Sequence, residues 1–225
     1  MALPYQNMDL IYRVCIASQK ALLNRFSDWE VEGVENIPER GPVVVVSNHV
    51  SNIDPSLLAA AMDPLRVHFL AKEQLFTHRA SRWFMSAYGA YPVRETGVQV
   101  GAYRWAKRLL ENNGALCVFP EGKRSTGGMV PGRQGATRLA LATDTPVLPV
   151  GISGTAHLGS ELRVFKPVGK LRVTIGPAFN LPQSESRPSY ARISALVDLT
   201  MGRIAELLQP SQRGYYAEVP VDQPG

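Results

Sequence analysis

Short segments that are apolar on both faces constrain this chain more than any other feature. Residues 43–47 read VVVVS, and residues 115–120 read ALCVFP. Strands buried on both faces are typical of a parallel sheet covered by helices on each side, whereas an antiparallel sheet commonly turns one face to water. The two segments therefore predict central strands of a helix-covered parallel sheet.

Helical segments alternate with strand segments along the rest of the chain. Further strands are predicted at 66–71, 146–153 and 171–176, and helices at 56–62, 81–89, 98–111, 136–143 and 187–208. Alternation of this kind favours a parallel sheet flanked by helices. No internal repeat or linker divides the 225 residues. We therefore expect a single α/β domain, with a mostly parallel central sheet flanked by helices and an amphipathic helix at its N-terminus.

The N-terminal helix is predicted over residues 7–26. Its apolar face is expected to hold Ile11, Cys15, Leu22 and Phe26, with Arg13, Lys20 and Asn24 opposite. A basic amphipathic helix lies on a membrane surface or packs on its own domain, and the sequence leaves both alternatives open. We divide the chain into this N-terminal unit (1–32), a domain (33–209) and a loosely ordered tail (210–225).

Composition narrows the class of protein. The net charge of +5 favours anionic partners, namely nucleic acid, phosphorylated substrates or acidic lipids. No nucleic-acid-binding motif supports the first of these. Cys15 and Cys117 form neither a disulfide framework nor a metal-site pattern, which indicates a reducing compartment and no metal site. No apolar run approaches the roughly 20 residues of a membrane-spanning helix, and no signal peptide is visible.

Polar residues collect where the predicted strands end. His49 follows the first strand, Glu121 to Ser125 follow the third, and Gly151 follows the fourth. Ligands of open α/β sheets bind beyond the carboxyl ends of the strands. We therefore expect a functional site at this edge of the sheet.

His49 and Asp54 have a chemical and a structural interpretation. Asp54 precedes Pro55 and suits the N-cap of the next helix. Its carboxylate can also accept the Nδ1–H of His49, which leaves Nε2 to take a proton from a substrate hydroxyl. The spacing alone is weak evidence, because His68 and Glu73 are similarly spaced and we interpret that pair as structural. No G-x-S-x-G elbow supplies a serine nucleophile, so the pattern predicts direct acyl transfer to a bound hydroxyl.

The segment FPEGKRS, residues 119–125, offers cations after a strand. Arg124 suits paired hydrogen bonds to a phosphate, and Arg133 in PGRQGA adds another cation. A solvated basic loop is the alternative for Lys123 and Arg124 alone. The P-loop pattern is absent, which argues against nucleotide hydrolysis. Arg94 in GAYPVRE is either a second phosphate ligand or a strand-end arginine in a salt bridge, and taken alone it favours the salt bridge.

In this order the segments resemble the lysophosphatidic-acid (1-acylglycerol-3-phosphate) acyltransferase family. The block N-H-x4-D matches Asn48, His49 and Asp54, the block F-P-E-G-x-R-S matches residues 119–125, and an apolar block with a central proline matches VLPVGISG around Pro149. The resemblance covers about residues 33–177. Lys123 stands where the family often has threonine, and Arg94 comes one residue early, with Glu95 in the expected place.

The resemblance implies an acyltransferase domain over 33–209 that uses acyl-CoA or acyl-carrier protein as co-substrate, without a cofactor or metal. His49 would be the general base and Asp54 its orienting partner. The residues implied for substrate binding are Asn48, Arg94, Glu121, Gly122, Lys123, Arg124, Ser125, Arg133 and Pro149. Arg94 and Arg124 would hold the acceptor phosphate with help from Lys123 or Arg133, while Glu121 would bind a glycerol hydroxyl or lock the arginines of its loop.

The implied reaction acylates a lysophospholipid, in the first place 1-acyl-sn-glycerol-3-phosphate, to give phosphatidic acid. An acyltransferase for another lipid or glycolipid acceptor, and a non-catalytic lipid-binding relative, are the alternatives. His49 and Asp54 argue against the non-catalytic relative. We expect a peripheral membrane protein at the cytoplasmic face.

Overall fold

A computed structural model describes residues 5–94, 99–183 and 188–218 of the chain. Within these residues, seven strands form one sheet in the order β1-β7-β6-β2-β5-β3-β4. β6 and β7 pair antiparallel, and the other neighbouring strands pair in parallel. The strands are β1 (Ser27–Glu32), β2 (Val43–Ser47), β3 (Val67–Lys72), β4 (Ala90–Val93), β5 (Ala115–Val118), β6 (Val147–Ser153) and β7 (Gly169–Ile175). The prediction of a single α/β domain with a mostly parallel sheet is confirmed.

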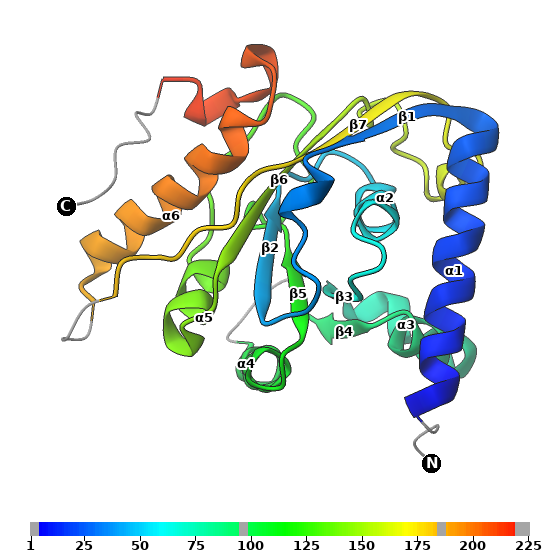
Figure 1. The fold of residues 1–225 in the computed structure, drawn as a ribbon, viewed down its shortest axis with the longest axis horizontal. Helices are drawn as coiled ribbons and strands as arrows, with labels where there is room; N and C mark the ends of the chain where they lie inside the picture. The colour runs from blue at the N-terminus through cyan, green and yellow to red at the C-terminus, as the bar shows by residue number, and fades with distance from the viewer. Residues whose placement is uncertain (1–4, 95–98, 184–187, 219–225) are drawn as a thin grey trace.

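Helices cover both faces of this sheet (Figure 1). The helices are α1 (Tyr5–Phe26), α2 (Asp54–Ala61), α3 (Arg79–Ala87), α4 (Val100–Glu111), α5 (Gly135–Thr143) and α6 (Tyr190–Glu206). All five residues of β2 are buried, because alternate side chains enter two different cores. Val43 and Val45 pack with α1 and α2, whereas Val44 and Val46 pack with α4, α5 and α6. A strand between two cores is apolar on both faces, as its sequence predicted.

Helix α1 packs against the domain through a different stripe from the expected one. Tyr12, Ile16 and Leu23 are buried, with the side chain of Gln19 buried in the same stripe. The predicted face, which includes Ile11 and Leu22, is only half-buried at the margin of that stripe. The helix is rotated about its axis relative to the prediction. The spacing of apolar residues did not specify this rotation, because apolar residues occupy more than one face. In the described residues, no helix combines the length and hydropathy that crossing a membrane requires.

Two further elements differ from the sequence expectation. Residues 27–32, expected within the N-terminal helical unit, form β1 and pair with β7. Trp29 and Val31 are half-buried while Asp28, Glu30 and Glu32 are exposed, an alternation that could have predicted the strand. Ala90–Val93 is the additional edge strand β4, in which Pro92 is tolerated because an edge position needs fewer backbone donors.

The segment after α6 packs more closely than the expected loose tail. Residues 210–212 and 214–216 form 3₁₀ turns, and Tyr216 is buried. The Tyr216 hydroxyl accepts a hydrogen bond from the backbone N–H of Gly132 and donates one to Asp198. Met129 exchanges backbone hydrogen bonds with Gln212 and Tyr215. The segment therefore lies behind the loop that follows β5, while residues 219–225 lie outside the described part.

Candidate active site

The turn between β2 and α2 carries His49. Asn48 is buried, and its side chain both donates to the carbonyl of Ile152 (2.9 Å) and accepts from the N–H of Ile152 (2.8 Å). This pair of bonds ties the end of β2 to β6. Because both groups of the Asn48 amide are used inside the protein, its geometry suits positioning of the turn rather than contact with a substrate.

Asp54 accepts three hydrogen bonds on one oxygen. Its Oδ2 lies 2.9 Å from His49 Nδ1, 2.6 Å from the N of Val50 and 2.7 Å from the N of Ser51. The carboxylate is fully buried, so these donors replace the water that it lost. Asp54 is the first residue of α2 and Ile53 is its N-cap, so the prediction that Asp54 caps the helix is corrected.

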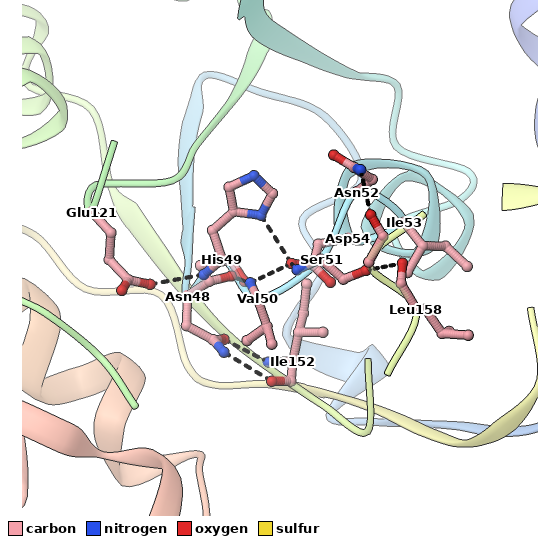
Figure 2. A network of polar contacts seen from close by, with 12 residues as sticks. Asn48, His49, Val50, Ser51, Asn52, Ile53, Asp54, Glu121, Ile152 and Leu158 are labelled. Atoms are coloured by element: carbon pink, nitrogen blue, oxygen red, sulfur yellow. Dashed lines mark hydrogen bonds and ion pairs between the residues drawn. The ribbon is translucent and has the colours of Figure 1, made fainter. Parts of the chain in front are cut away.

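The contact with Asp54 determines the tautomer of His49. Oδ2 is an acceptor, so in the neutral imidazole Nδ1 carries the proton and Nε2 keeps its lone pair. Figure 2 shows the ring leaving the end of β2 with its other nitrogen turned away from Asp54. The ring stacks on Phe119, with centroids 4.3 Å apart, and the side chain remains 19% exposed. Nε2 is therefore held in a fixed orientation at a partly open edge of the sheet.

Glu121 and Ser125 fix the backbone of His49. Glu121 Oε1 accepts from the N–H of His49 at 2.8 Å, and Oε2 accepts from the N–H of Val130 at 3.1 Å. Burial raises the pKa of the Glu121 carboxyl, and its two N–H partners oppose part of that shift. Ser125 donates its backbone N–H to the carbonyl of His49 at 2.8 Å. The loop of predicted phosphate ligands is thus bonded directly to the histidine.

Three cations lie along this loop. Lys123, Arg124 and Arg133 are exposed, and none of them forms an ion pair within the described residues. Arg133 crosses Gly122 so closely that a Cβ on Gly122 would lie 2.6 Å from Arg133 Nε. Gly122 thereby lets the guanidinium fold over the loop. The cations therefore remain available to an anionic ligand beside His49.

Two predicted site residues lie apart from this group. Arg94 follows β4, which β3 separates from β5, and its Nε lies 3.6 Å from Glu73 Oε2. This is the strand-end salt bridge that the sequence left as an alternative, and Glu95 lies outside the described residues. Pro149 lies inside β6 and is buried, paired with Val46. Gly151 is also within β6 rather than after it, because the strand extends to Ser153.

Two cavities border the sheet. One of about 140 Å³ lies behind the loop after β5 and is lined by Asn48, Glu121, Ser125 and Gln212, among others. A larger one of about 900 Å³ follows the edge strand β4 between α3 and α4, with His68, Tyr91 and Trp105 in its wall. The His49 side chain lines neither cavity and lies at the open edge of the sheet. In the described ranges no cluster of three or more His, Cys, Asp or Glu side chains is arranged to hold a metal ion.

A family model described as Acyltransferase matches residues 28–153, which is more than half of the chain. The chain belongs to the acyltransferase family. The matched range contains β2, the His49 turn and the loop after β5. The protein is therefore an acyltransferase, and this confirms the family resemblance.

Individual acyltransferases are similar over most of the chain. The 1-acyl-sn-glycerol-3-phosphate acyltransferase of Bacillus subtilis (strain 168) is 27% identical over 197 residues, which cover 88% of this chain and 96% of that protein. The protein of the same name from Pseudomonas aeruginosa is 29% identical over 189 residues, or 80% of this chain and 72% of that protein. The crystal structure of the 1-acyl-sn-glycerophosphate (LPA) acyltransferase PlsC from Thermotoga maritima superimposes with a TM-score of 0.70 at 28% identity, covering 92% of this chain and 83% of that one.

Sequence reasoning missed several contributors to this acyltransferase site. The backbone N–H groups of Val50 and Ser51 hold Asp54, and Phe119 stacks on His49. The sequence contained Phe119 within the matched block but gave no sign of the stacking. Tyr216 supports the loop from 84 positions beyond Gly132, and a contact at that separation leaves no local pattern.

Proposed function

We propose that this acyltransferase transfers a fatty acyl group from an acyl thioester to the free hydroxyl of 1-acyl-sn-glycerol-3-phosphate, giving phosphatidic acid. One observation carries the proposal. The Nε2 atom of His49 is oriented by Asp54 and lies beside a loop with three exposed cations that have no ion-pair partner among the described residues. A base next to a cationic loop suits an acceptor that carries both a hydroxyl and a phosphate.

The reaction needs one proton carrier and no enzyme nucleophile. His49 Nε2 takes the hydroxyl proton as the acceptor oxygen attacks the thioester carbonyl carbon, and Asp54 Oδ2 stabilises the resulting imidazolium through Nδ1–H. The tetrahedral intermediate then collapses, the new ester C–O bond remains, and the C–S bond breaks. The leaving thiolate recovers the proton from His49. The thioester is already activated, so no cofactor is required.

The acceptor phosphate is assigned to Arg124, with Lys123 and Arg133 as further cations. Arg124 lies next to Ser125, whose N–H bonds the His49 carbonyl, so a phosphate held there places the acceptor close to Nε2. Arg94 is the second ligand of this proposal only if it leaves Glu73. That exposed contact is weak, since surface ion pairs contribute about 0–1 kcal/mol, so a doubly charged phosphate can displace it.

The Arg94–Glu73 contact also favours a second candidate function. With Arg94 engaged, the predicted phosphate ligands that remain are Lys123, Arg124 and Arg133 on the loop after β5, which suits a lysolipid with a different headgroup or a glycolipid. A matrix of acceptors against the two donors, acyl-CoA and acyl-carrier protein, separates the candidates. Highest turnover with an acceptor that lacks a phosphate monoester favours the second one.

A lipid acceptor places the enzyme at a membrane. We propose a peripheral location at the cytoplasmic face, where a reducing environment suits Cys15 and Cys117, both free thiols. The acyl thioester donor, either acyl-CoA or acyl-carrier protein, reaches the enzyme from the aqueous side.

Thiol release tests the proposed reaction. Purified protein with acyl-CoA or acyl-carrier protein should release free thiol on addition of 1-acyl-sn-glycerol-3-phosphate, and phosphatidic acid should form in equal amount. Thiol release without lipid product would indicate hydrolysis instead. If neither donor reacts with any lipid acceptor, the catalytic proposal is incorrect.

A further inference from the structure

The segment between β6 and β7 presents two large apolar side chains to solvent. We call residues 160–166 the finger. Leu162 is 75% exposed and Phe165 is 68% exposed, although both are large apolar side chains. Glu161–Val164 form a 3₁₀ turn, closed by hydrogen bonds such as that from the N–H of Phe165 to the carbonyl of Leu162. In a turn of about three residues, side chains at i and i+3 lie one above the other, so Leu162 and Phe165 share one side.

The rest of the fold keeps this side outward. Val164, between the two exposed residues, is partly buried and packs against the core beneath β2 and α2. Because Val164 packs against the core, the turn cannot rotate so as to bury Leu162 and Phe165. The turn therefore holds both side chains in solvent. Single apolar residues scattered over a surface are ordinary, whereas two that are held exposed on one side need an explanation.

Basic side chains surround the exposed pair. Arg163 and Lys166 lie within the finger, Lys170 is the second residue of β7, and all three are exposed. None of them forms an ion pair with another described residue. Apolar side chains flanked by free cations match the interface of an anionic membrane, where acyl chains lie beneath phosphates.

The two residues before the finger are bonded to the turn that carries His49. Ser51 donates its hydroxyl to the carbonyl of Leu158, and Asn52 Nδ2 donates to the carbonyl of Gly159 at 2.8 Å. Figure 2 shows Leu158 beside Ser51, which follows His49 by two residues. Leu162 follows Gly159 by three residues, so their Cα atoms are within about 11 Å. In Figure 1 the yellow-green segment that contains the finger lies between α2 and α1 in this view.

We propose that the finger docks on a bilayer that contains anionic lipid, with Leu162 and Phe165 in the interface and Arg163 and Lys166 at lipid phosphates. This inference rests on the proposed function in one respect, since a lipid acceptor would pass from the same bilayer to His49. A protein partner fits less well, because a specific protein interface buries about 800 Å² on each side and the finger offers only two apolar side chains on one turn.

Vesicle flotation tests the finger. The probe is a vesicle of phosphatidylcholine and phosphatidylglycerol in equal parts, compared with phosphatidylcholine alone. The double variant Leu162→Ser/Phe165→Ser should bind the mixed vesicles at least about tenfold more weakly, because the buried apolar area is lost. The matched control is Tyr190→Ser, which removes a side chain that is also 75% exposed but lies at the start of α6. It should bind like the parent.

A charge variant tests whether Arg163 and Lys166 contact lipid phosphates. Arg163→Gln/Lys166→Gln should weaken binding to the mixed vesicles by about fivefold for each cation and should leave binding to pure phosphatidylcholine unchanged. Thermal unfolding of each variant shows whether it folds. Parent-like binding by the Leu162/Phe165 variant, equal loss in the Tyr190 control, or loss of binding only to an added acidic carrier protein would overturn the inference.

The vesicle experiment is independent of catalysis. His49→Ala should float with vesicles like the parent. Turnover of a short-chain, monodisperse acceptor by the parent measures the proposed function without a bilayer. Absence of that turnover with normal flotation would count against the proposed function alone, whereas normal turnover with unchanged flotation of the finger variant would count against the finger alone.

Discussion

The imidazole of His49 is held by groups that each act on a different part of the residue. Asp54 bonds the ring, Glu121 bonds the backbone N–H and Ser125 bonds the backbone carbonyl. Phe119 covers one face of the ring. The proposed general base must keep its lone pair directed at the proton it removes, and these contacts fix that direction before a substrate binds.

Replacement of the base should stop turnover. We expect His49→Ala to lower kcat by about 10²- to 10⁴-fold, because a positioned base contributes about that factor to the rate. The side chain is partly exposed at the edge of the sheet, so the thermal unfolding temperature should change little. Steady-state kinetics together with thermal unfolding check this. Near-parental kcat in a folded variant would refute the role of His49.

Arg124 should affect binding rather than the chemical step. Arg124→Ala is expected to raise the acceptor KM and to leave kcat and the donor KM nearly unchanged, because a phosphate contact is present before the transition state. Arg104→Ala on α4 removes another exposed arginine away from the loop and serves as the control. A rise in donor KM instead would assign Arg124 to the thioester substrate.

At the scale of elements, the loop after β5 is held from behind by the C-terminal segment. Gly214 makes the closest approach, since an added Cβ would lie 2.3 Å from the carbonyl oxygen of Met129. Its φ of 50° is also unfavourable for other residues. The position of this loop, and of Arg124 within it, therefore depends on residues near the end of the chain.

Substitution of this glycine should separate the segment from the loop. We expect Gly214→Ala to destabilise the protein by about 1–3 kcal/mol and to raise the acceptor KM several-fold, because the loop that carries Arg124 shifts. The matched control is Gly127→Ala in the loop after β5, where an added Cβ meets no atom within 4 Å. Denaturant unfolding and steady-state kinetics measure both effects. Equal behaviour of the two variants would show that the contact does not position the loop.

At the scale of the whole molecule, the sheet order brings the site together. β2 lies between β5 and β6, so the turn after β2 is adjacent to the loop after β5 and to the end of β6. The same arrangement leaves His68 of β3 half-buried beside α4. Burial, aided by Arg66, lowers the pKa of His68 to about 4 from its ordinary 6.5.

The depressed pKa of His68 makes the free energy of unfolding depend on pH. Between pH 6.5 and 4 the unfolded chain binds a proton at His68 that the folded protein excludes, so the free energy of unfolding should fall as the pH falls through this window. The effect reaches roughly 3 kcal/mol at most. His68→Phe should flatten this dependence, measured by denaturant unfolding across the window. An unchanged slope in His68→Phe would contradict the assignment.

The sequence by itself determined the fold class and the chemistry available at the edge of the sheet. Four consecutive valines specify a strand between two cores, and their alternation between those cores follows from the pleat alone. The position of His49 directly after that strand, five residues before Asp54, lets a short turn bring Nδ1 to the carboxylate. These are local consequences of residue order. Periodicity predicted the strand, whereas the contact between His49 and Asp54 was one of two interpretations that the spacing left open.

Only the tertiary structure decided which residues remain free for a ligand. The amide of Asn48 bonds Ile152, and the carboxylate of Glu121 accepts from two backbone N–H groups. Arg94 contacts Glu73. Lys123 and Arg124, in contrast, have no ion-pair partner in the described residues. The partners of these residues lie on other strands and loops. Contacts between such distant segments depend on strand order and on the packing of the helices, and no local pattern records them.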